Sequence, residues 1–275
     1  GSHTVDLLLD QGYAVRVLDD LSSGQSSNLD HRKSDSKLTF DVCDLVGLKN
    51  NDPHFSGADY VFHFGGIGDI VPSIEHPARY MEINVMGTIN ALEAARHAGV
   101  SKFVYAASSS CYGLATELPT SETAIIDPQY PYALSKLQGE QAALHWGKIY
   151  SLPVISMRIF NAYGPRSRTT GAYGAVFGVF IAQKLSGSPF TVVGDGAQTR
   201  DFVFATDVAR AFLLAAESKF ANEIYNLGTG EPKPVNRIVE LLGGPVVNVP
   251  KRPGEPECTW ADTSKILSQL GWSPE

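Results

Sequence analysis

The stretch T-V-D-L-L-L-D-Q-G-Y-A-V-R-V-L-D-D, residues 4–20, decides the fold. Residues 4–12 place their apolar side chains at helical intervals on one face and end at a glycine, which predicts a short helix. Residues 13–18 predict a strand that ends at Asp19, just before a turn rich in serine and glycine. Helix, strand and acidic residue in this order form the second half of a dinucleotide-binding β-α-β unit. In such a unit, a carboxylate at this position accepts hydrogen bonds from the adenosine ribose.

The first half of that unit, a strand and a glycine-rich turn of about a dozen residues, does not stand in the sequence before this helix. Two interpretations are open: Gly1 is the last glycine of that turn, or Gly1-Ser2-His3 remains from a purification tag. Neither supplies the strand, whose loop would hold the pyrophosphate at a helix N-terminus. We therefore expect the natural protein to carry this strand, since without it cofactor binding should fail.

Strands and helices continue to alternate through the first part of the chain. The clearest are helices over residues 78–97 and 132–150 and strands over residues 38–40, 60–63, 103–107 and 154–157. This alternation predicts an α/β fold, a Rossmann-type doubly wound parallel sheet with its first strand absent, and a smaller interleaved C-terminal lobe. We expect residues 1–158 to bind the dinucleotide and residues 159–275 mainly to bind substrate. Segments around 200–228 are expected to return to the first domain.

Composition excludes several classes of function. The net charge of −7 argues against a nucleic-acid-binding surface. We also expect no membrane partner, because no apolar run approaches the ~20 residues that span a bilayer. The three separated cysteines, Cys43, Cys111 and Cys258, predict reduced thiols in a cytoplasmic protein. The seven histidines lack metal-binding spacing, so no metal site is expected.

Tyr132 and Lys136 stand four residues apart in the predicted helix 132–150, and therefore on one face. A tyrosine is a poor base at neutral pH because its ordinary pKa is about 10. A neighbouring ammonium group favours the phenolate and makes general base catalysis possible. The alternative is an ordinary amphipathic helix, since this spacing is common by chance.

Three serines, Ser108, Ser109 and Ser110, follow the buried strand 103–107. Parallel sheets bind ligands at the carboxyl ends of their strands, so a hydroxyl here can pass a proton between a substrate oxygen and Tyr132. A solvated turn is the alternative interpretation.

Several motifs resemble the extended short-chain dehydrogenase/reductase superfamily. They are V-Y-A-A-S-S-S-C-Y-G (104–113), Y-A-L-S-K (132–136), R-I-F-N-A-Y-G-P-R (158–166), G-D-G-A-Q-T-R-D-F-V (194–203), Y-N-L-G-T-G (225–230) and R-P-G-E-P-E (252–257). The resemblance runs along the whole chain in order and is strongest to UDP-hexose 4-epimerases of the NAD-dependent epimerase/dehydratase family. It implies a tightly held NAD, a nucleotide-sugar substrate and a homodimer paired through helices 78–97 and 132–150.

The resemblance also assigns individual residues. Ser108 falls where such enzymes keep a catalytic Ser or Thr, with Ser109 or Ser110 able to share that role. Cofactor residues would be Gly1, Asp19, Asp44 and Lys136. Residues for the nucleotide sugar would be Asn161, Arg200, Arg252, Glu255 and Thr259. The alternative to phosphate binding by the two arginines is surface ion pairing with Asp201 and Glu255.

The expected reaction is 4-epimerisation through a 4-keto sugar. Related 4,6-dehydratases carry an Asp-Glu pair after the catalytic threonine, where this chain has Ser109 and Ser110. A 4-reductase, a dehydratase, a 3,5-epimerase and a non-enzymatic NAD-binding protein remain alternatives. Asp19 argues against NADP, since a carboxylate repels a 2′-phosphate. By resemblance, the small side chain of Thr259 would admit UDP-N-acetylglucosamine as well as UDP-glucose. The alternative interpretation is that Thr259 is a strand residue that lies far from the sugar.

Overall fold

The computed structural model describes residues 1–167, 176–251 and 254–275. The chain begins with α1 (Ser2–Asp10), which buries the apolar face that the sequence predicts, and Gly12 follows with φ 89°. Strand β1 (Val15–Asp19) then pairs in parallel with β2 (Leu38–Val42). The predicted helix, strand and acidic residue are all found, with strand β1 ending at Asp19.

A parallel sheet of four strands forms the centre of the molecule, in the order β10-β5-β4-β3. Its strands are β3 (Tyr60–His63), β4 (Lys102–Ser108), β5 (Val154–Ile159) and β10 (Glu223–Leu227). All of its neighbouring pairs are parallel. Among the described residues, β1 and β2 form a separate parallel sheet, and no hydrogen bonds of the sheet join β1 to β3.

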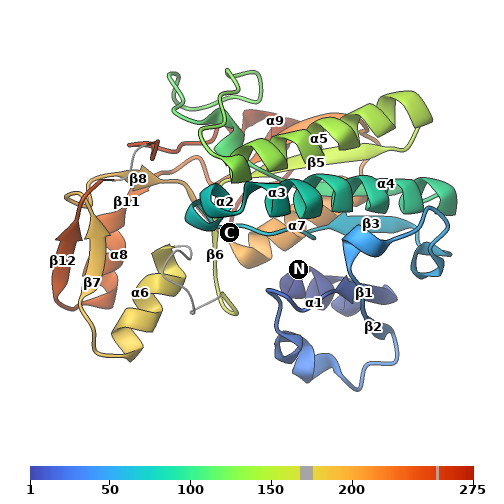
Figure 1. The fold of residues 1–275 in the computed structure, drawn as a ribbon, viewed down its shortest axis with the longest axis horizontal. Coiled ribbons are helices and arrows are strands. Elements are labelled where there is room, and N and C mark those ends of the chain that lie inside the picture. Colours follow the sequence, from blue (N-terminus) through green and yellow to red (C-terminus); the bar gives the residue numbers. More distant parts are fainter. Residues whose placement is uncertain (168–175, 252–253) are drawn as a thin grey trace.

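Helices cover both faces of the central sheet, as expected for a doubly wound fold (Figure 1). Alternate side chains of β4 point to opposite faces. Val104 and Ala106 pack against Phe212 of α7 (Ala205–Glu217), whereas Phe103 and Tyr105 pack toward helices on the other face. Those helices are α4 (Gly87–Ala98) and α5 (Pro131–Tyr150). The predicted α/β class is therefore confirmed.

The helix expected over residues 78–97 is not one regular helix. It consists of α3 (Pro77–Met81), a π-helical turn η4 (Glu82–Met86) and α4, and it ends at Gly99 with φ 71°. The short helix α2 (Ile70–Glu75) precedes it. The helix predicted over 132–150 corresponds to α5 almost residue for residue.

The remaining elements build the second lobe and the connections. They are η1 (Ser26–Arg32), η2 (Leu45–Gly47), η3 (Pro53–Phe55), η5 (Ser109–Tyr112), β6 (Asn161–Tyr163), α6 (Val176–Leu185), β7 (Phe190–Val193), β8 (Thr199–Arg200), β9 (Phe202–Phe204), β11 (Lys233–Pro234), α8 (Val235–Leu242), β12 (Val246–Val249) and α9 (Ser264–Leu270). Strands β7 and β12 pair with each other, and β7 shares an apolar cluster with α6 and α8. The domain division at residue 158 stays a prediction.

Candidate active site

Tyr132 and Lys136 lie in the first two turns of α5, which begins with Pro131 after the extended residue Tyr130. Proline suits the first turn of a helix because its missing N–H has no intrahelical partner there. The Tyr132 side chain lies near the side chain of Ser108 at the end of β4, close enough for the Ser108 hydroxyl to influence the pKa of Tyr132. Lys136 is buried one helical turn further on. The structure therefore brings together the phenol, the ammonium and one hydroxyl of the predicted catalytic group.

The three serines differ in their surroundings. Ser108 is the last residue of β4, and its Oγ lies 2.8 Å from the Oγ of Ser110. The Ser108 Oγ also accepts a hydrogen bond from the backbone N–H of Ser110 at 3.2 Å. Ser109 begins the short helix η5. Since Ser108 contacts Tyr132 and Ser110 contacts Ser108, the geometry favours Ser108 as the catalytic hydroxyl.

Burial shifts the pKa values of Tyr132 and Lys136. It raises the pKa of Tyr132; the Ser108 hydroxyl opposes this effect, and the charge of Asp69 adds to it. Burial also lowers the pKa of Lys136 to about 8, against the opposing charge of Glu140. Lys136 is therefore mostly protonated at neutral pH.

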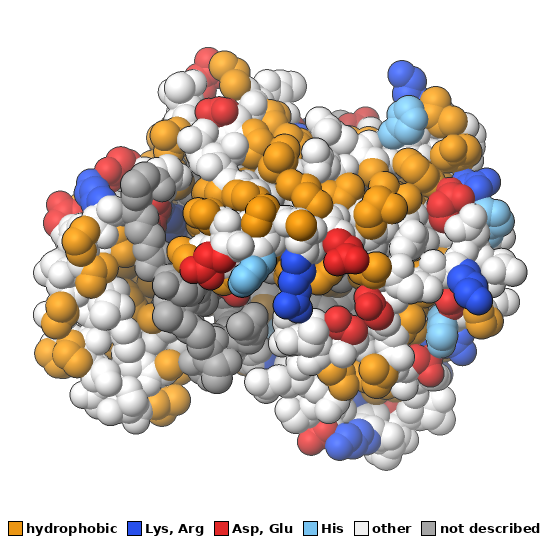
Figure 2. Space-filling model, viewed as in Figure 1, with side chains coloured by type: hydrophobic (Ala, Val, Ile, Leu, Met, Phe, Trp, Pro, Cys, Tyr) orange, Lys and Arg blue, Asp and Glu red, His pale blue; other side chains and the backbone are white. Residues whose placement is uncertain are grey.

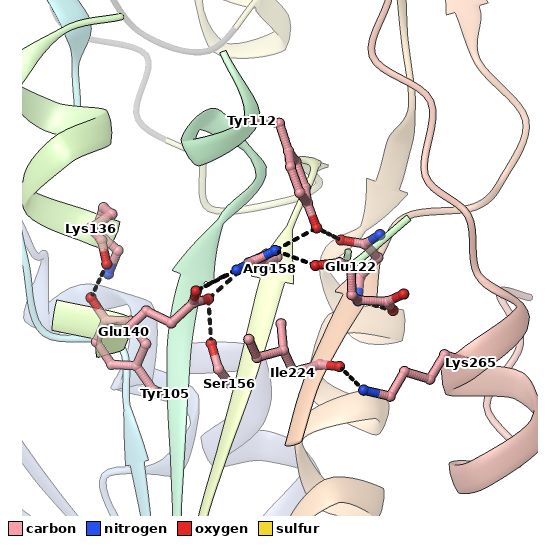
Figure 3. Close-up of polar contacts among 10 residues, drawn as sticks. Tyr105, Tyr112, Glu122, Lys136, Glu140, Ser156, Arg158, Ile224 and Lys265 are labelled. Atoms are coloured by element: carbon pink, nitrogen blue, oxygen red, sulfur yellow. Dashed lines mark hydrogen bonds and ion pairs between the residues drawn. The ribbon is translucent and has the colours of Figure 1, made fainter. Parts of the chain in front are cut away.

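A buried ion pair lies behind the catalytic helix (Figure 3). Arg158 of β5 donates from Nη2 to Oε1 of Glu140 at 2.6 Å and from Nε to Oε2 at 3.0 Å. The hydroxyl of Ser156 donates to the same carboxylate at 2.8 Å. Burial alone would lower the pKa of Arg158, but the bonds and charge of Glu140 raise it above its usual value. The sequence analysis did not identify this pair, although Glu140 follows Lys136 at the same four-residue spacing that links Tyr132 to Lys136.

This ion pair continues toward the segment that follows the serines. The Nη1 of Arg158 donates to the hydroxyl of Tyr112 at 2.8 Å and to the carbonyl of Glu122 at 3.1 Å. Tyr112 in turn donates to the side chain of Asn226 at 2.6 Å. Helix α5, strands β5 and β10 and the segment around residues 112–122 are thereby tied together (Figure 3).

The loop after β3 is held against the catalytic helix by Asn84, which was also missed. Its Oδ1 accepts from the backbone N–H of Ile67 at 2.7 Å, and its Nδ2 donates to the carbonyl of Ile67 at 3.0 Å. The same amide donates to the hydroxyl of Ser135 at 2.9 Å. Asn84 lies in the π-helical turn η4, whose irregular register the sequence pattern does not indicate.

The expected cofactor residues lie at the start of α1 and at the ends of β1 and β2. Gly1 is the N-cap of α1, with Asp19 among its charged neighbours. The carboxylate of Asp19 accepts from the backbone N–H of Leu21 at 2.8 Å, and Gly24 lies so close that a Cβ there would come 2.8 Å from it. Asp44 caps η2 by accepting from Val46. A fixed carboxylate at the end of β1 fits the ribose of a dinucleotide.

The expected substrate residues gather on the other side of the site. The Oγ1 of Thr259 donates to the side-chain oxygen of Asn161 at 2.9 Å. Arg200 is buried and donates from Nη2 to Glu255 at 2.9 Å. Of the two acidic partners considered for Arg200, the structure therefore selects Glu255. Arg252 lies outside the described residues.

Asp201 organises this group of residues, and the structure gives its carboxylate no ion pair with an arginine among the described residues. Its carboxylate is fully buried and accepts four hydrogen bonds, from the N–H and hydroxyl of Thr229 and the N–H groups of Gly230 and Ala261. The backbone N–H of Asp201 bonds to the Oγ1 of Thr259 at 3.2 Å. One acidic residue thus connects three distant chain segments beside Asn161.

Among the described residues, no group of three or more His, Cys, Asp or Glu side chains could hold a metal ion. None of the helices in the described ranges is both long and apolar enough to cross a membrane.

Known proteins match this chain along its length. The model of the NAD dependent epimerase/dehydratase family matches residues 1–228. The putative UDP-glucose 4-epimerase of Methanocaldococcus jannaschii is 35% identical over 283 residues, covering 100% of this chain and 90% of the relative. The UDP-N-acetylglucosamine 4-epimerase of Methanobrevibacter ruminantium M1, solved in complex with UDP-N-acetylmuramic acid, has a TM-score of 0.94 and 30% identity. The structural match covers 100% of this chain and 89% of the solved chain.

A solved enzyme of different activity is similar to the same degree. The dTDP-glucose 4,6-dehydratase of Streptomyces venezuelae, with NAD and TYD bound, has a TM-score of 0.93 and 29% identity. It covers 100% of this chain and 88% of that one. The dinucleotide-type fold, the site geometry and matches over the whole length agree, and the chain belongs to the NAD dependent epimerase/dehydratase family.

Proposed function

We propose that this enzyme epimerises a UDP-hexose at C4. The observation that carries the proposal is the placement of Tyr132 beside Ser108 at the carboxyl end of β4, with Lys136 buried one turn along α5. A base, a proton-sharing hydroxyl and a fixed cation are the groups that reversible oxidation of a sugar hydroxyl requires.

Each of the three side chains has a separate task. Tyr132 takes the proton from the C4 hydroxyl, and Ser108 hydrogen-bonds the same substrate oxygen so that the proton moves along a short path. Lys136 stays charged and favours the phenolate form of Tyr132. Gly1, Asp19, Asp44 and Lys136 would hold the NAD. Bound NAD⁺ would supply the hydride acceptor for C4 and, once reduced, the hydride donor to the opposite face of the 4-keto sugar, while Tyr132 would give the proton back to the C4 oxygen.

The residues after Ser108 favour epimerisation over loss of water. Removal of water from C5 and C6 needs an acid and a base beside the sugar. Ser109 and Ser110 stand where related dehydratases carry two carboxylates, and Ser110 is hydrogen-bonded to Ser108. Serine hydroxyls are poor acids and bases, so the 4-keto sugar would take back the hydride instead.

The substrate specificity is proposed to depend on Thr259. Its hydroxyl is engaged with Asn161 and with the backbone of Asp201, which fixes the orientation of a small side chain. A small residue here leaves room for an N-acetyl group at C2 of the sugar. Asn161, Arg200 and Arg252 are proposed to bind the nucleotide diphosphate, since arginines present fixed donors to phosphate. Glu255, which pairs with Arg200, is proposed as a further substrate residue.

A homodimer and a cytoplasmic location remain part of the proposal. Hydrophobic side chains gather on the face that carries α2 to α5, as Figure 2 shows. Exposed members of this group include Ile74, Met86 and Leu134. Pairing of α4 and α5 across a two-fold axis would cover such a surface. Light scattering should then give twice the monomer mass.

The direct test is turnover without added cofactor. The protein with its natural N-terminus is incubated separately with UDP-glucose and UDP-N-acetylglucosamine, and anomeric proton signals are followed by NMR. New signals of the C4 epimer are expected from both substrates. The Tyr132→Phe variant should lose about 10²- to 10⁴-fold in rate. Tyr13→Phe, which removes a hydroxyl bonded to Glu217 far along the chain, should retain the full rate.

A Thr259→Tyr variant tests specificity in the same assay. It should lose turnover of UDP-N-acetylglucosamine and keep that of UDP-glucose. Formation of a dehydrated product, or absence of any C4 epimer while NAD stays bound, would refute the proposed reaction.

A further inference from the structure

Tyr105 lies directly beneath the catalytic helix, although its side chain does not reach the open end of the sheet. It sits in the middle of β4 and is completely buried on the face that α4 and α5 cover. Its hydroxyl donates to the backbone carbonyl of Lys136 at 3.1 Å. In an α-helix, each carbonyl accepts a hydrogen bond from the N–H four residues further along. The Lys136 carbonyl therefore receives one hydrogen bond from within α5 and a second from Tyr105 of β4.

The ring of Tyr105 also supports the Lys136 side chain. The Nζ of Lys136 lies over the ring, 4.5 Å from its centroid. An ammonium group at this distance is attracted by the negative face of an aromatic ring, and the attraction is larger where water is excluded. Lys136 is buried, so both conditions hold. Figure 3 shows Tyr105, Lys136 and Glu140 gathered at this end of the network.

Gly139 makes this arrangement possible. A Cβ at position 139 would come within 2.3 Å of the Tyr105 hydroxyl oxygen and 3.0 Å of its Cζ. The helix can therefore approach the strand closely enough for the hydroxyl to reach the Lys136 carbonyl only because this residue has no side chain. Tyr105, Lys136 and Gly139 form one fitted contact between β4 and α5.

The other groups that face Lys136 do not duplicate this contact. Glu140 lies one turn along the same helix and is engaged by Arg158. From β3, His63 stacks on Tyr105 with ring centroids 5.7 Å apart, and burial lowers its pKa to about 3, so it carries no charge. Tyr132 is the group on which Lys136 acts. The ring of Tyr105 is thus the contact that the central strand supplies to the ammonium.

We propose that Tyr105 is a positioning residue for Lys136, its ring holding the ammonium group and its hydroxyl fixing the helical turn that carries it. This inference rests on the role proposed above for Lys136. A tyrosine that merely filled the core would contribute volume and no electrostatic effect, and the two roles can be separated by experiment.

The primary measurement is the titration of Lys136 itself. Protein labelled with ¹³C at lysine Cε is followed by NMR as a function of pH, and the Lys136 signal is assigned with Lys136→Gln. Tyr105→Phe keeps the ring and should leave the pKa of Lys136 unchanged. Tyr105→Leu removes the ring and should lower that pKa by about one unit, which corresponds to about 1.4 kcal/mol.

A graded series avoids a cavity in the core. Phenylalanines with one, two and three ring fluorines at position 105 nearly preserve the volume and progressively weaken the negative face of the ring. The pKa of Lys136 should fall step by step along this series. If Tyr105→Leu fails to fold, the fluorinated series alone decides the question.

Tyr225 supplies the matched control. It is equally buried in another strand of the same sheet, and Lys265 lies over its ring at 5.1 Å. Tyr225→Leu should destabilise the fold comparably and leave the titration of Lys136 unchanged. A flat fluorine series, or an equal shift in Tyr225→Leu, would overturn the inference.

The pH dependence of turnover provides a second measurement. A lower pKa of Lys136 means that its positive charge is lost at a lower pH. The alkaline limb of kcat should therefore move down by about one unit in Tyr105→Leu and stay in place in Tyr225→Leu. The NMR titration needs no substrate, so failure of the proposed epimerisation would leave that measurement interpretable.

Discussion

Replacing Glu140 by glutamine should destabilise the protein far more than the loss of one hydrogen bond. The side chains of Glu140 and Arg158 are only 3% and 5% exposed, and three hydrogen bonds join them. Glutamine keeps the size but removes the negative charge, leaving the Arg158 guanidinium buried beside neutral partners. Breaking a buried pair from one side costs about 3–5 kcal/mol. For a chain of this size, that corresponds to a fall in Tm of roughly 10 °C.

Equilibrium unfolding in urea, followed by circular dichroism at fixed protein concentration, measures this cost. The double variant Glu140→Gln/Arg158→Met tests its origin, because it removes both charges together. We expect the double variant to be more stable than Glu140→Gln alone, since replacing both partners of a buried ion pair is often nearly neutral.

An exposed pair on α8 provides the control. Arg237 and Glu240 are joined at 3.0 Å, with side chains 55% and 62% exposed. Glu240→Gln should cost less than about 1 kcal/mol. A free energy of unfolding for Glu140→Gln within about 1 kcal/mol of the wild type would contradict this explanation. So would a double variant whose loss equals the sum of the losses measured for Glu140→Gln and Arg158→Met alone.

Two further predictions concern other buried contacts. His63 stays neutral in the fold because burial, and secondarily Lys136, lowers its pKa from 6.5 to about 3. Its contribution to stability is present above pH 6.5. It should decline as the pH falls toward 3, by up to about 1.4 kcal/mol per unit, because only the unfolded chain binds the proton. Urea unfolding at several pH values should show a shallower decline for His63→Gln and no change for the exposed His97→Gln. Gly139→Ala should lower the free energy of unfolding by about 1–3 kcal/mol, despite the better helix propensity of alanine, because its Cβ meets Tyr105. A stabilised Gly139→Ala protein would contradict the contact described between β4 and α5.

Local patterns were sufficient to predict the elements that frame the site. The apolar spacing of residues 4–12 predicted α1, and the run that ends at Asp19 predicted β1. The four-residue spacing of Tyr132 and Lys136 predicted that both lie on one face of α5. The rule that strands of a parallel sheet present ligands at their carboxyl ends placed the three serines at the site, and the family resemblance singled out Ser108 among them.

Contacts between distant segments could not be predicted in the same way. Glu140 meets Arg158 because β5 runs under α5, and neither residue carries a local signal of this pairing. Thr259 and Asn161 are 98 positions apart, and they meet through the folding of the second lobe. The resemblance to a family indicated which of these residues belong to the site, but not which of them touch.

The interrupted helix was beyond prediction for a different reason. Regular apolar spacing over residues 78–97 fits an uninterrupted helix, and the cost of a π turn must be offset by tertiary contacts. Here Asn84 supplies those contacts, through Ile67 and Ser135. Such a gain becomes visible only when the loop after β3 and helix α5 are both in place.

The π turn η4 also constrains how this protein can change in length during evolution. Each residue advances a helix by about 100° around its axis, so one residue lost from 82–86 would turn everything before it away from its partners. Surface loops absorb insertions and deletions easily because few contacts depend on their register. The segment from α3 to α4 lacks that freedom. Single-residue gaps should therefore be rare there among functional descendants, even where the amino acids themselves diverge.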